Sequence, residues 1–149
     1  MLNQILTQIY ERDLNKLKAE IEQFSDESDL WKTSDGITNS AGNLCLHLTG
    51  NLQHFIGAVL GASGYVRDRD AEFASKNIPK DVLLQNIDST IAVLRETLAK
   101  MSDDDFDRTY PLEVFDHPMT TGYFLTHLTT HFNYHLGQIN YHRRLLATA

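Results

Sequence analysis

Histidine stands out among the residue types of this 149-residue chain, which contains seven histidines but a single cysteine. His131 and His135 are four residues apart, so on a helix their rings stand one turn above each other on the same face. This HxxxH spacing allows one helix to present two imidazole nitrogens to a single metal ion. The pair therefore predicts a metal centre, provided that the segment is helical and that both rings face the interior.

The segment around this pair has the periodicity of an amphipathic helix. If each residue advances the helix by 100° and Leu128 is set at zero, three later apolar side chains fall within about 40° of it. His135 falls at about 340° and His131 at about 300°, on or beside this apolar face. His127 falls closer to solvent, at about 260°. We therefore predict that His131 and His135 are ligands, with His127 as an alternative.

A second helix predicted near residues 40–61 supplies a third candidate ligand. With Leu44 at zero, His47 falls at about 300° and Asn51 at about 340°, so both lie near the buried face. His54 falls at about 280° and is the alternative third ligand. Three imidazoles leave part of the coordination sphere open, which is typical of catalytic rather than structural metal sites.

Four helices are available to position these side chains. Apolar residues recur at helical spacing in four segments separated by polar, glycine or proline-containing stretches, at about 2–24, 40–61, 80–101 and 120–146. The acidic residues 102–105 are predicted to form a connection, and residues 110–119, with two prolines, an extended segment or a short hairpin. This pattern predicts an all-α four-helix bundle in a single domain over residues 1–149, with the topology left open.

Composition excludes several classes of function. The chain has 13 Lys plus Arg against 20 Asp plus Glu and a net charge of −7, which argues against nucleic-acid binding. No apolar run approaches the roughly 20 residues of a membrane helix, and the N-terminus lacks the features of a signal peptide. We therefore expect a cytoplasmic protein without a membrane segment. The single Cys45 is expected to be a small buried filler.

We expect the other conspicuous polar residues to play no part in the predicted metal centre. The charged run from Arg67 to Glu72 is read as a solvated loop or short helical turn, and no carboxylate base is evident beside the histidines. His142 is predicted to be a cation at a helix end, and His117 a loop residue. Trp31 is expected to be a hydrophobic plug after the first helix.

Two sequence blocks resemble the DinB/YfiT-like superfamily of bacterial four-helix-bundle proteins. Residues 39–51, NSAGNLCLHLTGN, are similar to the family's second-helix histidine motif, and residues 131–139, HFNYHLGQI, are similar to its HxxxHxGQI helix. The resemblance implies that His47, His131 and His135 are the metal ligands. It also implies an up-down-down-up arrangement of the helices and, as in many members, a homodimer. Residues 67–73 resemble a subfamily without an assigned function.

The resemblance also implies an activity, because characterised relatives include metal-dependent transferases that use thiols such as bacillithiol or mycothiol. We therefore expect a divalent ion, Zn²⁺ or Ni²⁺, a low-molecular-weight thiol as co-substrate and a small electrophile as substrate. A divalent ion held by neutral ligands keeps its charge and promotes deprotonation of a thiol or water. Asn51 and Gln138 are candidate contacts to substrate or to the ligand histidines. A metal-dependent hydrolase and a non-catalytic metal-binding or dimerising bundle are the alternatives.

Overall fold

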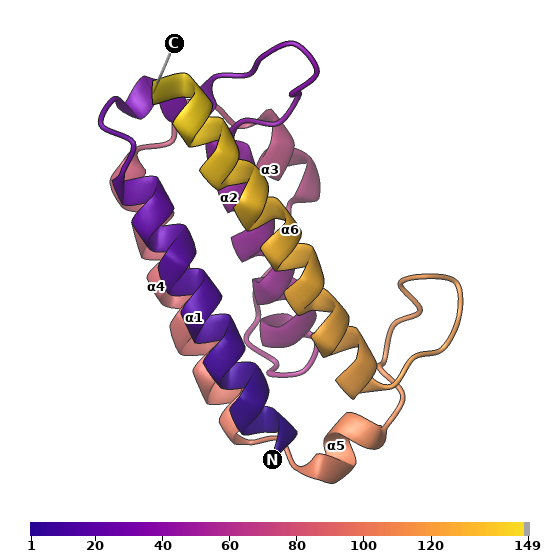
Figure 1. The fold of residues 1–149 in the computed structure, drawn as a ribbon. Helices are drawn as coiled ribbons and strands as arrows, with labels where there is room; N and C mark the ends of the chain where they lie inside the picture. The colour runs from indigo at the N-terminus through magenta and orange to yellow at the C-terminus, as the bar shows by residue number, and fades with distance from the viewer. Residues whose placement is uncertain (148–149) are drawn as a thin grey trace.

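Four long helices bring their apolar faces together in one core (Figure 1). In the computed structural model, which describes residues 1–147, they are α1 (Leu2–Glu22), α2 (Ala41–Leu52), α4 (Lys80–Ala99) and α6 (Thr121–Ala147). Most apolar positions that the sequence periodicity places on the inner faces are buried, whereas Ile5, Val82 and Leu145 are exposed. The prediction of an all-α four-helix bundle is confirmed, and only the second helix departs clearly from its predicted form.

That departure occurs at Gln53, where α2 passes into a π-helix, η2 (Gln53–Ala58). The amide of Val59 donates to the carbonyl of His54 at 3.0 Å, and the amide of Gly61 donates to Ile56 at 3.0 Å. These five-residue steps widen the helix and rotate the side chains that follow, relative to the α-helical phase. A constant step of 100° per residue, which the prediction for this helix assumes, therefore does not hold from His54 onward.

Short helices occupy the connections between the long ones: the 3-10 helix η1 (Glu27–Trp31), α3 (Arg69–Ala74) and α5 (Asp103–Asp107). The last of these corrects the prediction that residues 102–105 form a plain connection. Ser102 and Asp105 make a capping box, in which the Ser102 amide donates to the Asp105 carboxylate at 2.8 Å. Acidic side chains at the start of a helix also interact favourably with its dipole, so this segment is helical.

The connection before α6 closes on itself like a short hairpin, one of the two forms predicted for it. Thr109 and Thr120 form an isolated antiparallel bridge, and the amide of Tyr110 donates to the carbonyl of Met119 at 2.8 Å. The Tyr110 hydroxyl then donates to the carbonyl of Phe55 in η2 at 2.6 Å. This bond holds the 109–120 loop against the second helix, on the side of the bundle where α2 and α6 meet.

The helices run up, down, down and up, as the family resemblance implies (Figure 1). Lys80 at the start of α4 donates to the carbonyl of Phe24, just after α1, at 2.6 Å, and Asn3 in α1 donates to Leu98 near the end of α4 at 3.4 Å. These contacts make α1 and α4 antiparallel neighbours. α2 and α6 are also antiparallel and adjacent, so side chains from both helices can share one space.

The packing agrees with the positions predicted for Cys45, Trp31 and His117. Cys45 is fully buried, and burial raises the pKa of its thiol to about 12, so it is an unreactive filler. Trp31 packs partly buried against the core, and His117 lies exposed in the 109–120 loop. No helix within residues 1–147 combines the length and hydropathy needed to cross a bilayer.

Candidate metal centre

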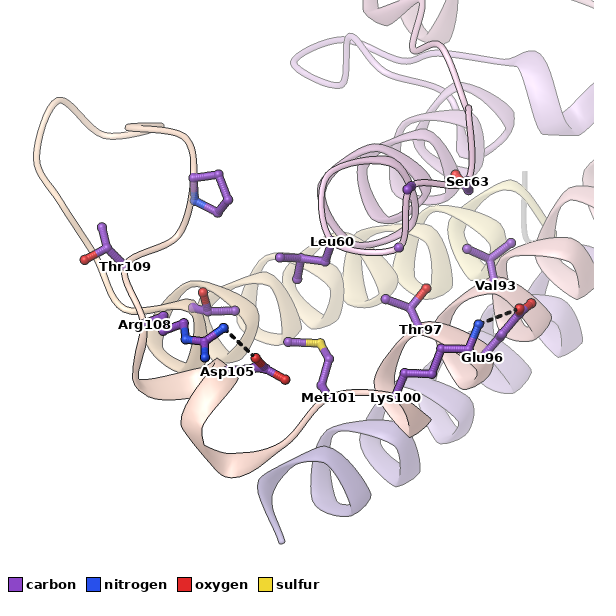
Figure 2. A pocket seen from close by; sticks show the side chains of 14 residues that line it. Leu60, Ser63, Val93, Glu96, Thr97, Lys100, Met101, Asp105, Arg108 and Thr109 are labelled. Carbon is purple, nitrogen blue, oxygen red and sulfur yellow. Dashed lines mark hydrogen bonds and ion pairs between the residues drawn. The ribbon is translucent and has the colours of Figure 1, made fainter.

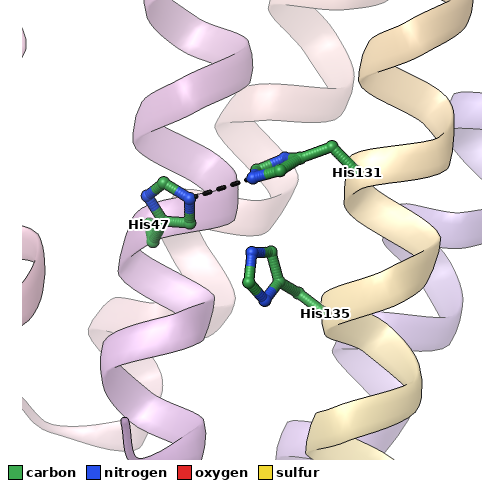
Figure 3. Close-up of side chains that lie close together, drawn as sticks. All are labelled: His47, His131 and His135. Carbon is green, nitrogen blue, oxygen red and sulfur yellow. Dashed lines mark hydrogen bonds between the residues drawn. The ribbon is translucent and has the colours of Figure 1, made fainter.

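Three histidine side chains converge between α2 and α6 (Figure 3). His47 projects from α2, and His131 and His135 project from successive turns of α6. One ring nitrogen from each residue can be chosen so that all three atoms lie within 4.8 Å of one another. These are the three residues selected by helical phase, and the structure brings them together.

The spacing of the ring nitrogens suits a small divalent ion. Nε2 of His47 and Nε2 of His131 lie 3.2 Å apart. Zn–N bonds of about 2.0–2.1 Å in tetrahedral geometry place two ligand nitrogens roughly 3.3 Å apart. Nδ1 of His131 is buried and has no hydrogen-bond partner within the part of the chain that the structure describes. The arrangement therefore fits a metal ion held by imidazole nitrogens.

A buried carboxylate supports His47 from behind. Glu72, in α3, accepts a hydrogen bond from Nδ1 of His47 at 3.0 Å, and only 6% of its surface is exposed. Arg67 donates to both carboxylate oxygens at 2.9 Å. Burial opposes ionisation of Glu72, but the hydrogen bonds from His47 and Arg67 outweigh it and lower the pKa of the carboxyl. With its proton on Nδ1, His47 directs the lone pair of Nε2 toward the other histidines.

This pair corrects the interpretation of residues 67–72 as a solvated charge run without a carboxylate near the histidines. The charges of Arg67 and Glu72 neutralise each other in a buried ion pair, which removes most of the cost of burying either one. Asn43 holds the segment in place, because its side-chain amide donates to the carbonyls of Glu72 at 3.0 Å and Ser75 at 2.8 Å. The side of α3 that bears Glu72 is therefore fixed against α2, one turn before His47.

A glycine makes room for the carboxylate. Gly50 lies one turn after His47 on α2, and a Cβ atom added at this position would overlap the Glu72 carboxylate. A glycine inside a helix costs about 1 kcal/mol relative to alanine. At position 50 this cost is offset, because the absence of a side chain leaves space for the Glu72 carboxylate against α2. A glycine inside a helix, such as Gly50, is a sequence signal for a group packed closely against that helix.

Gln138 supports His135 as Glu72 supports His47. Its side-chain oxygen accepts a hydrogen bond from Nδ1 of His135 at 2.7 Å, three residues away on α6. Nε2 of His135 is then the unprotonated nitrogen. Of the two contacts predicted for Gln138, to a candidate ligand histidine or to substrate, the structure contains a contact to His135.

The environment favours neutral imidazoles at the cluster. Burial, together with the neighbouring His135 and His47, lowers the pKa of His131 to about 4. Burial also lowers the pKa of His135, against the raising effect of its hydrogen bond to Gln138. Metal ligation requires an unprotonated nitrogen, so both residues can donate lone pairs at neutral pH.

The remaining histidines do not belong to the group of three converging ring nitrogens. The rings of His54 and Phe55 meet edge to face with centroids 4.8 Å apart, and those of His127 and Phe115 do so at 4.9 Å. His142 corrects the prediction of a helix-end cation: it is 4% exposed, and burial lowers its pKa. Its Nε2 has no hydrogen-bond partner within residues 1–147, so neutral His142 is part of the interior.

Two cavities differ in their relation to this cluster. One of about 400 Å³ lies between α2, α6 and the 109–120 loop, and its wall includes His47, His131 and the buried Asn51. Asn51 Oδ1 lacks a hydrogen-bond partner among the described residues. A larger one of about 560 Å³ lies near the end of α4 and α5 (Figure 2). None of the three clustered histidines lines it.

Comparison with known proteins places the fold. The sequence model of a family described as "Protein of unknown function (DUF1572)" matches residues 3–149. The structure is similar to that of a conserved protein from Enterococcus faecalis, with 15% identity, a TM-score of 0.79 and coverage of 98% of this chain and 97% of that chain. It is also similar to a DinB-like protein from Bacillus cereus ATCC 10987, with 18% identity, a TM-score of 0.71 and coverage of 95% and 91%. A search of curated proteins finds no significant match.

Proposed function

Since this chain belongs to the family described as protein of unknown function (DUF1572), we propose a function from the chemistry of its own histidine cluster. We propose that His47, His131 and His135 bind one divalent metal ion. We further propose that the protein uses this centre to transfer a low-molecular-weight thiol to a small electrophile.

The observation that supports metal binding is the convergence of three ring nitrogens from two helices. Two of the rings are oriented from their far side, His47 by Glu72 and His135 by Gln138. Outer contacts of this kind fix the tautomer and orientation of ligand histidines. A chance group of surface histidines would have no reason to share this arrangement.

The thiol has to be external to the protein. The only cysteine, Cys45, is fully buried with a raised pKa and cannot act as the nucleophile. A divalent ion, when bound, supplies a positive charge that favours the thiolate form of a coordinated thiol. In the transfer, the thiol sulfur forms a bond to an electrophilic carbon, the leaving group departs with its bonding electrons, and the thiol proton goes to solvent.

The protein's own residues provide the neutral ligands and their orientation. Three neutral imidazoles leave the charge of a divalent ion uncompensated, whereas carboxylate ligands would reduce it. The carboxylate of Glu72 contacts the far nitrogen of His47, and Arg67 balances its charge. This design places negative charge near the centre without placing it on the metal.

Three finer assignments belong to the same proposal. The ion is Zn²⁺ or Ni²⁺, because all-imidazole sites suit late first-row metals. The protein is a cytoplasmic homodimer. Its substrates are small molecules, and the net charge of −7 argues against a nucleic-acid partner.

Elemental analysis of the purified protein tests the metal centre. We expect about one divalent ion per chain in the wild type and in His117→Ala, which alters an exposed loop histidine. His135→Ala should retain little metal after dialysis. Equal metal content in wild type and His135→Ala would contradict the assignment of the site.

An assay with candidate thiols and a chromogenic electrophile tests the reaction. Product formation should require both the metal and the thiol, and the product should contain the thiol sulfur. Thiol-independent product formation would favour a hydrolase at the same centre. No metal-dependent turnover with any thiol would overturn the transferase and leave a metal-binding bundle.

A further inference from the structure

The cavity of about 400 Å³ beside the histidine cluster has the size of a site for a small organic molecule. It opens on His47 and His131, so a molecule held there would reach the ligand face of the cluster. The 109–120 loop covers one side of it. The character of the remaining wall determines which class of molecule it accepts.

Aromatic side chains form much of that wall. Phe55, Phe115 and Phe124 all line the cavity. The rings of Phe55 and Phe124 meet edge to face at 5.1 Å, and the rings of Phe115 and Phe124 do so at 6.2 Å. Tilted rings of this kind offer both edges and faces to a flat guest. The wall therefore favours a planar apolar body over a flexible polar one.

The charges around the cavity all have one sign. Arg67 and Arg69 line it, whereas no aspartate or glutamate does so, in a chain with 20 acidic and 13 basic residues. Arg67 is balanced by Glu72. Arg69 is exposed, and within residues 1–147 it has no ion-pair partner; its guanidinium lies 5.5 Å from the Phe73 ring centroid. The cavity thus has one uncompensated positive charge near a wall of aromatic rings.

We propose that this cavity binds the electrophilic substrate and selects molecules with a flat apolar body and an anionic group. The body packs against Phe55, Phe115 and Phe124, and the anion interacts with Arg69. This inference rests on the proposed function, because it names the class of electrophile that the metal centre acts on. Aromatic carboxylates, sulfonates and phosphate esters with a reactive carbon have this form.

Binding to the metal-free protein tests the inference without any contribution from coordination. The probes are a naphthalenesulfonate and the corresponding neutral sulfonamide, which share the ring and differ in charge. By titration calorimetry we expect the sulfonate to bind about fivefold more tightly, as an exposed charge pair allows. Amide NMR shifts should map both probes to residues of this cavity.

Three variants separate the contributions of the wall. Arg69→Gln should abolish the preference for the sulfonate. Arg144→Gln is the matched control, because this exposed arginine lies 5.6 Å from the Tyr141 ring and does not line the cavity. Phe115→Ala, at a side chain that is 44% exposed, should weaken both probes to the same extent.

Equal affinity for the two probes, an unchanged preference in Arg69→Gln, or no binding of either probe would overturn the inference. These outcomes are distinct from failure of the proposed function, because the metal-free titration requires neither metal binding nor thiol turnover. Conversely, a protein that shows the sulfonate preference but binds no metal would retain the anion site and lose the proposed enzyme.

Discussion

The cavity near the end of α4 and the cavity beside the histidine cluster differ more in their polar groups than in their size. The one near the end of α4 has a volume of about 560 Å³, but its charged side chains are paired with near neighbours along the chain (Figure 2). Lys100 donates to Glu96 at 3.1 Å, and Arg108 to Asp105 at 3.1 Å. The smaller one, of about 400 Å³, opens on histidines from two different helices.

This difference indicates that a candidate functional site is identified by the convergence of polar side chains from different helices and not by the volume of a cavity. In the larger cavity each charge is satisfied locally, so nothing there requires a further ligand. At the histidine cluster, partners on the far side occupy Nδ1 of His47 and His135 and leave Nε2 for something else. A ligand that binds these Nε2 atoms gains interactions for which the larger cavity has no equivalent groups.

The largest expected effect comes from removing a nitrogen of the cluster. His131→Ala should lower the affinity for Zn²⁺ by about 100-fold or more, because one of three ligands is lost. His127→Ala, one turn away on the same helix, should leave the affinity near that of the wild type. Competition with a chromogenic chelator measures both. Similar losses in the two variants would mean that His127 belongs to the centre.

A smaller but clear effect is expected behind His47. Glu72→Gln keeps a hydrogen-bond acceptor but removes the charge, and it should lower metal affinity by about 10- to 100-fold. Nitrogen-15 NMR of the His47 ring should show a weaker preference for the proton on Nδ1. Glu96→Gln, at the larger cavity, is the control. Identical affinities in the two variants would show that Glu72 is merely structural.

The pH dependence of stability should also reflect the cluster. Burial holds the pKa of His131 near 4, against an ordinary value of 6.5, so the unfolded chain binds a proton more readily. Stability contributed by neutral His131 is complete above pH 6.5 and declines as the pH falls toward 4.

Urea unfolding of the metal-free protein measures this decline. Between pH 7 and pH 5 we expect His131 alone to account for a loss on the order of 1 kcal/mol. His131→Gln should therefore lose less stability than the wild type over this interval. A loss as large in the variant as in the wild type would place the titration elsewhere in the chain.

The smallest effect should come from the larger cavity. Lys100→Gln breaks an exposed pair with Glu96, and such pairs contribute little. The free energy of unfolding should change by less than about 0.5 kcal/mol, and metal content should not change. A loss of metal in Lys100→Gln would contradict the conclusion that the larger cavity plays no part in metal binding.

Helical periodicity placed His47, His131 and His135 near the buried faces of their helices, although it kept His54 and His127 as alternatives. Each of the three lies on a long α-helix whose apolar stripe defines the buried direction, so a side chain near that stripe must point inward. His131 and His135 lie on an uninterrupted α6, and His47 lies on α2 before the π-helix begins. His54 lies inside η2, where the assumption of a constant 100° step no longer holds.

The burial of Glu72 and Arg67 could not be predicted from helical periodicity, because a connecting segment has no apolar face that shows which of its side chains point inward. Their burial depends on where the segment docks, and Asn43 on another element fixes that position. The prediction for His142 was wrong for a related reason. Its place in the last turns of α6 indicates a favourable interaction with the helix dipole, but neighbouring elements cover it. Local patterns do not record contacts made by distant parts of the chain.

Gly50 has a consequence for anyone who would make this protein more robust. Replacing a helical glycine with alanine is a standard route to higher thermal stability. Here the added methyl group would occupy the space of the Glu72 carboxylate. The change would displace the Glu72 side chain from its place beside His47, and a shorter acid, as in Gly50→Ala combined with Glu72→Asp, would relieve the overlap. The side chains at positions 50 and 72 therefore compete for the same space. The length of the Glu72 side chain limits how far a substitution at Gly50 can raise thermal stability.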